Sequence, residues 1–158
     1  MTEGYIQILI ESLEKKLVVL DKIIELDKRQ LEIATQQPFD MLVYDKSMDE
    51  KGVLIDEINR LDEGFTSTYE RIKDEVQANP DKYREKVLVL QDLIREAVDK
   101  GTKIEVQEKR NKSAMELAVR TKRQEIRQMK VSSSAATKYY KAMSRINDVD
   151  PQLMDRKK

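Results

Sequence analysis

The stretch that decides the fold is Leu9-Ile-Glu-Ser-Leu-Glu-Lys-Lys-Leu-Val-Val-Leu-Asp-Lys-Ile-Ile-Glu-Leu26. Its apolar residues recur at alternating intervals of three and four, and no glycine or proline interrupts it. This spacing places the apolar side chains on one face of a helix and most charged side chains on the other. The stretch therefore predicts an amphipathic helix that packs against other helices.

Two prolines divide the chain on either side of a second helical pattern. Pro38 and Pro80 each lie in a short polar break, and Pro80 suits the first position of a helix. Asp40 and Asn79 are residues that cap the start of a following helix. The predicted helices cover about 3–36, 40–78 and 80–130.

Short turns between helices make neighbours antiparallel. Folding the chain at the two breaks brings Leu20 level with Ile58 and Gly101, and the two larger side chains are expected to fill the space above the glycine. The sequence thus predicts an all-α fold, an antiparallel up-down-up bundle of three long helices over residues 1–130. The predicted seam of the first helix, meaning its row of core-facing residues, is Ile6, Ile10, Leu13, Leu17, Leu20, Ile24, Asp27, Leu31 and Ala34.

One level of the predicted bundle is polar. Asp27, Lys51 and Glu108 each interrupt the apolar seam of their own helix, and all three fall at the same height. Lys51 is placed to bridge the two carboxylates. Such a cluster fixes the register of a bundle more often than it performs chemistry, so we interpret it as a structural polar layer.

The third helix is longer than its partners, and residues 119–130 are expected to project beyond the bundle. Residues 131–158 are predicted to form a flexible tail with a short amphipathic segment at about 134–146. Three interpretations of that segment remain: binding to a partner, docking onto its own bundle, or disorder. The candidate partner-binding residues are Ala135, Ala136, Tyr139, Tyr140, Met143 and Ile146.

The composition removes most routes to catalysis. The chain has no His and no Cys, so the commonest general base, the commonest metal ligand and thiolate chemistry are all missing. Ser132, Ser133 and Ser134 therefore have no histidine base, and no glycine-rich phosphate loop is present. We expect no enzymatic activity, no cofactor and no metal.

Charge is unevenly distributed along the chain. Residues 1–79 contain 10 Lys/Arg and 18 Asp/Glu, whereas residues 80–158 contain 20 and 12. Acidic helices packed beside a basic one explain this better than nucleic-acid binding, because acids interrupt the basic stretch and aromatic residues do not accompany it. No apolar run approaches a membrane span and no signal pattern opens the chain, so a cytoplasmic location is expected.

The overall layout resembles flagellar export chaperones of the FlgN type, and FliT-like chaperones share the same architecture. The resemblance rests on the first amphipathic helix, the break at Phe39-Asp40, and the stretch Lys51-Gly-Val-Leu-Ile-Asp-Glu-Ile-Asn-Arg-Leu-Asp-Glu-Gly-Phe65. A long third helix that leads into a Ser/Ala segment with tyrosines completes it.

The resemblance implies a cytoplasmic chaperone that binds the C-terminal helical region of hook-associated flagellar proteins and delivers them to the export gate. In that family a tail tyrosine takes part in delivery, and Tyr139 and Tyr140 are the two positions that could match it. The alternative is a non-enzymatic coiled-coil adaptor that self-associates through its tail, and the chain is in either case a possible homo-oligomer.

Overall fold

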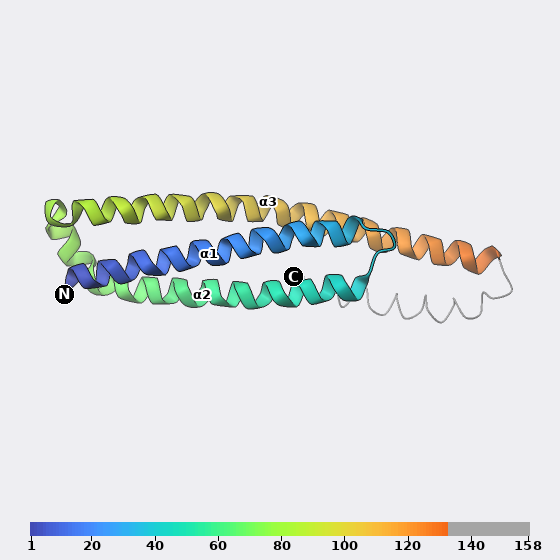
Figure 1. Ribbon diagram of the computed structural model, residues 1–158, viewed down its shortest axis with the longest axis horizontal. Coiled ribbons are helices and arrows are strands. Elements are labelled where there is room, and N and C mark those ends of the chain that lie inside the picture. The colour runs from blue at the N-terminus through green and yellow to red at the C-terminus, as the bar shows by residue number, and fades with distance from the viewer. Residues whose placement is uncertain (133–158) are drawn as a thin grey trace.

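The computed structural model describes residues 1–132, which form three α-helices. These are α1 (Thr2–Thr35), α2 (Met41–Ala78) and α3 (Pro80–Ser132) (Figure 1). No strand occurs in this part of the chain, so the predicted all-α class is confirmed, and the helix bounds lie within two residues of those expected. None of the three helices is both long and apolar enough to cross a membrane.

The two turns use the polar residues next to the prolines in different ways. Asp40 caps the start of α2, because its Oδ1 accepts hydrogen bonds from the backbone N–H groups of Leu42 (3.1 Å) and Val43 (3.2 Å). Asn79 was expected to cap α3 in the same way, but its side-chain amide donates back to the carbonyl of Glu75 at 3.0 Å. Asn79 therefore satisfies the end of α2, and α3 begins directly at Pro80.

Helix α1 lies between α2 and α3 and packs against both along its length, whereas α2 and α3 scarcely contact each other (Figure 1). The expectation of one narrow seam on α1 was therefore incomplete. Leu17, Ile24 and Leu31 are only half-buried, while a second row beside the predicted one is fully buried. The buried residues of α1 are Ile6, Leu9, Ile10, Leu13, Val19, Leu20, Ile23, Leu26, Asp27, Gln30 and Ala34.

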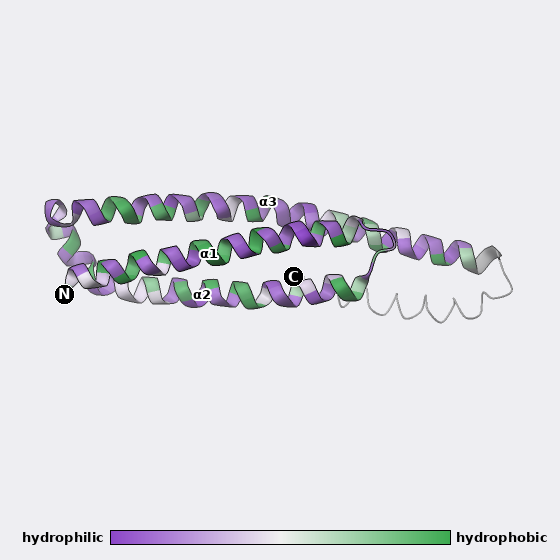
Figure 2. Ribbon diagram, viewed as in Figure 1, coloured by the Kyte–Doolittle hydropathy of each residue, from purple (hydrophilic) through white to green (hydrophobic). Residues whose placement is uncertain are grey.

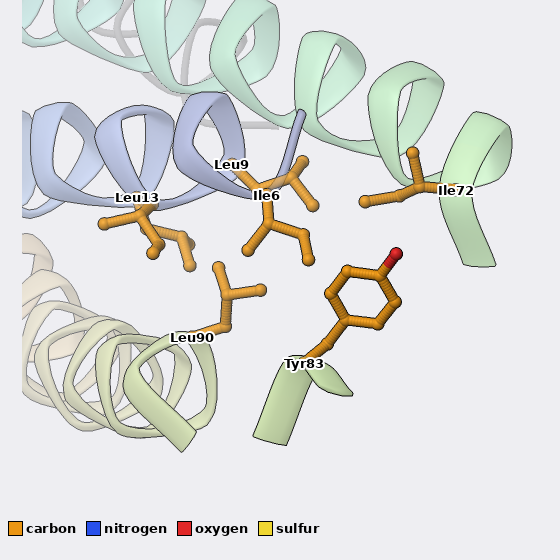
Figure 3. Packing of buried hydrophobic residues seen from close by; sticks show 7 residues of the cluster. Ile6, Leu9, Leu13, Ile72, Tyr83 and Leu90 are labelled. Atoms are coloured by element: carbon orange, nitrogen blue, oxygen red, sulfur yellow. The ribbon is translucent and has the colours of Figure 1, made fainter. Parts of the chain in front are cut away.

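Apolar clusters close the two ends of the bundle. In the first, side chains from all three helices surround the start of α1, and Tyr83 of α3 faces Ile6 and Ile72 (Figure 3). In the second, Phe39 of the α1–α2 turn meets Tyr44 edge-on at 6.0 Å between ring centroids. Each cluster joins residues that are distant in sequence, so together they set the antiparallel alignment of the helices.

Helix α3 continues past the α1–α2 turn (Figure 1). The projection was expected to begin at residue 119, but Val119 is buried in the second cluster. One turn later, the Nζ of Lys122 donates to the backbone carbonyl of Phe39 at 2.8 Å. The projecting segment is therefore 123–132, about 15 Å at helical rise. It is largely hydrophilic (Figure 2).

The central position of α1 predicts that two nearby isoleucines contribute very differently to the free energy of unfolding. Ile6 is completely buried and Ile8 is 50% exposed. Ile6→Ala should lower the free energy of unfolding by about 3 kcal/mol, because it removes buried methyl groups and leaves a cavity. Ile8→Ala, the matched control, should change it by less than about 1 kcal/mol. Urea denaturation followed by circular dichroism measures both, and equal effects would contradict the burial of this face.

Candidate partner-binding groove

Because α1 holds α2 and α3 apart, an apolar groove remains between them. Leu20 and Ile23 of α1 form its floor, Ile55 and Ile58 of α2 line one wall, and the other wall includes Gly101 of α3. The hollow at this level measures about 500 Å³. Leu20 and Ile58 were expected to fill the space above Gly101. They do not, because Ile58 is only half-buried and nothing lies within 4 Å of a Cβ built on Gly101.

The groove continues toward the other end of the bundle. A second hollow of about 340 Å³ is lined by Phe65 and Tyr69 of α2 and by Val87 and Ile94 of α3. These residues follow the same alternating spacing as those of the first hollow, so both hollows belong to one face. We call this face the α2–α3 groove. Its apolar side chains reach the surface, since Ile55 is 45% exposed and Ile94 is 41% exposed.

The polar layer predicted from the sequence lies in this groove. The Nζ of Lys51 is 2.9 Å from Oδ1 of Asp27 and 2.6 Å from Oε1 of Glu108. Asp27 and Lys51 are buried, whereas the side chain of Glu108 is 40% exposed and helps to line the groove together with Lys51. Lys51 thus bridges two carboxylates contributed by α1 and α3.

Buried amide and hydroxyl side chains extend the polar layer by one helical turn. The Nε2 of Gln30 donates to Oγ of Ser47 at 3.0 Å, and the Nδ2 of Asn111 donates to the backbone carbonyl of Asp27 at 2.9 Å. Neither Gln30 nor Ser47 was predicted from the sequence. Their spacing is the available signal: Gln30 and Asn111 follow Asp27 and Glu108 by three residues, so each lies on the same helical face as its charged neighbour.

Burial makes the electrostatics of this layer unusual. It raises the pKa of the Asp27 carboxyl to about 6, and the carboxylate of Glu108 adds to that rise while the ammonium of Lys51 opposes it. Burial also raises the pKa of the Tyr44 phenol to about 12, with Glu108 and Asp27 as further causes.

Ion pairs between the helices match the uneven charge of the sequence. Helix α2 contains 5 Lys/Arg and 10 Asp/Glu, whereas α3 contains 14 and 9. On the α2 side of α1, Lys16 pairs with Asp62 at 2.7 Å. On the α3 side, Asp21 pairs with Lys100 at 2.6 Å. Partly exposed pairs of this kind contribute little stability, but they match the orientation of α1 between an acidic and a basic helix.

Across residues 1–132, no three side chains of the His, Cys, Asp and Glu types lie close enough together to hold a metal ion. The candidate partner-binding residues Ala135, Ala136, Tyr139, Tyr140, Met143 and Ile146 all lie outside the described residues. The α2–α3 groove was not foreseen from the sequence and is the candidate site that the structure describes.

Comparison of the chain with protein-family models, with curated proteins and with solved structures finds no match in any of the three.

The raised pKa of Asp27 predicts a pH-dependent cost to stability. Folded Asp27 keeps its proton up to about pH 6, whereas the unfolded chain releases it near the ordinary value of 3.8. The folded state therefore binds more protons between about pH 4 and 6, and the contribution of Asp27 to stability falls as the pH rises through that window, by up to about 3 kcal/mol. Asp27→Asn should remove this dependence.

Chemical denaturation at a series of pH values measures the effect. The difference in unfolding free energy between wild type and Asp27→Asn should shift in favour of the variant between pH 4 and 6. The exposed Asp99→Asn serves as a control and should leave the pH profile unchanged. Parallel profiles for wild type and Asp27→Asn would contradict the assignment.

Proposed function

We propose that the chain is a non-enzymatic, cytoplasmic export chaperone of the FlgN type. In this proposal it binds the C-terminal helical region of hook-associated flagellar proteins and delivers them to the export gate. The observation that supports the binding role is the α2–α3 groove, where apolar residues of two helices have no covering neighbour among residues 1–132. The flagellar identity of the partners rests on the resemblance of the sequence to that chaperone family.

The dimensions and chemistry of the groove favour an amphipathic helix as its occupant. The exposed side chains on its walls repeat at helical intervals, as in Ile55 and Tyr69 on α2 and Ile94 on α3. An amphipathic helix laid along such a groove contributes its own residues at similar intervals and buries both sets. Each apolar side chain that is fully covered gains about 1.5–3 kcal/mol from leaving water. A short segment that is disordered alone can therefore fold as it binds.

The proposal also includes the tail. In the proposal, Ala135, Ala136, Tyr139, Tyr140, Met143 and Ile146 add to the partner contact, and Tyr139 or Tyr140 engages the export gate. The projecting end of α3 supports this role, because residues 123–132 extend beyond the α1–α2 turn and the tail follows them directly. The bundle and the tail would thus hold two separate parts of one delivery complex.

A pair of matched substitutions on α2 tests the groove. Ile55 lines it, whereas Val53 is more exposed and does not. Ile55→Asp should weaken binding of the C-terminal segment of a hook-associated protein at least tenfold, because a carboxylate would be buried against apolar side chains. Val53→Asp should bind like wild type. Isothermal titration calorimetry measures binding, and circular dichroism checks that both variants are folded.

The outcomes separate the parts of the proposal. Absence of binding by the full-length wild-type chain would exclude the chaperone role. Equal binding by Ile55→Asp and wild type would exclude the groove as the site. Equal binding by a chain that ends at Lys130 would exclude a contribution from the tail to this contact.

A further inference from the structure

We propose that the polar layer makes the α2–α3 groove selective, so that it accepts a helix carrying one hydrogen-bond donor side chain within its apolar stripe. The donor would lie level with Lys51 and Glu108 and would limit the register of the bound helix. This inference rests on the proposed binding function and specifies the kind of helical segment that fits.

The layer contains more acceptors than donors. Asp27 and Glu108 present four carboxylate oxygens, and Lys51 supplies one ammonium that lies near one oxygen of each. The amide of Asn111 is already used, because it donates to the backbone carbonyl of Asp27 and to Oε1 of Gln30. Glu108 is the member that water still reaches from the groove. A helix that covers it removes this water and must replace its hydrogen bonds.

On the α2 wall of the groove, apolar residues border the layer on both sides. Tyr44 and Met48 precede Lys51 on α2, while Ile55 and Ile58 follow it, and all four line the same hollow. On α3, Ile104 precedes Glu108 in the same hollow, whereas Lys109, Asn111 and Lys112 follow it. A donor that is shifted by one turn toward Ile55 and Ile104 would meet apolar side chains on both walls and lose its partners. The polar layer therefore limits the register of the bound helix on that side, as a buried polar residue does in a coiled coil.

The charge pattern favours a segment of another protein over the chain's own tail. Helix α1 already occupies a place between α2 and α3, and there it presents Lys16 to acidic α2 and Asp21 to basic α3. A second helix that lies between α2 and α3 is likewise favoured if it has basic residues on the side facing α2 and acidic residues on the side facing α3. The segment 134–146 contains three basic residues, Lys138, Lys141 and Arg145, but no Asp or Glu. This segment therefore has no acidic side chain that could pair with the basic residues of α3.

Synthetic helices test the inference with the full-length protein. The probe is a 28-residue amphipathic peptide, about 40 Å long, with a leucine stripe and one central guest position. The guest is Asn, Leu or Asp. We expect the Asn peptide to bind about tenfold more tightly than the Leu peptide, because Leu would exclude water from the Glu108 carboxylate without replacing its hydrogen bonds. The Asp peptide should bind most weakly, since it adds a carboxylate to two others.

A variant with an apolar layer provides the complementary measurement. Asp27→Leu combined with Lys51→Met and Glu108→Leu should reverse the order, so that the Leu peptide binds most tightly. Replacing a whole buried charge cluster in this way is commonly tolerated. Glu105→Leu, at an exposed position of α3, is the matched control and should keep the wild-type order.

The wild-type series is decisive by itself. Equal binding of the Asn and Leu peptides, or tighter binding of Leu, would overturn the inference and leave the proposed binding function intact. Binding by none of the three peptides would overturn both.

Discussion

The structure depends on the width of the apolar face of α1. A helix with a single narrow seam would allow its two partners to close over it and meet. Helix α1 instead buries adjacent residues, such as Leu9 with Ile10 and Val19 with Leu20, so it packs against a neighbour on each side. Its partners then remain apart, and the apolar residues of α2 and α3 that face each other are left partly open to solvent. The groove is a direct consequence of this geometry.

The same geometry explains why the polar layer can exist. Asp27 is completely buried, and a buried carboxylate is costly unless it is paired. The long side chain of Lys51 crosses from α2 to reach it, while Glu108 approaches from α3 and stays partly in water. Three apolar side chains of similar volume are expected to stabilise the bundle as much as this cluster or more. The layer therefore makes better sense as a determinant of alignment and selectivity than as a source of stability.

The sequence was sufficient for the helices and for the layer, because both depend on local signals. Proline breaks and Asp40 set the bounds, and three charged residues that interrupt regular seams are visible without coordinates. The groove depends instead on the angle at which α2 and α3 pack on α1. The spacing of a single seam on each helix does not determine that angle. The doubled apolar positions of α1 were the available clue. The predicted seam included Ile10 and Leu20 but omitted their buried neighbours Leu9 and Val19. A seam that narrow implied that the helices close around one core, and for that reason the space above Gly101 was expected to be filled.

The three helices are unequally buried, so a ligand in the groove would stabilise them to different extents. Helix α2 fully buries only Tyr44, Ser47, Lys51 and Ile72, so α1 alone holds most of its length. A ligand that contacts both walls of the groove would add the contacts that α2 lacks with α3, and binding stabilises the state to which the ligand binds. The elements that gain most are those with the fewest buried contacts, because their local opening costs least. Occupation of the groove would thus reduce local opening of α2 more than that of the other helices. The partner would supply the contacts between α2 and α3 that the bundle lacks by itself.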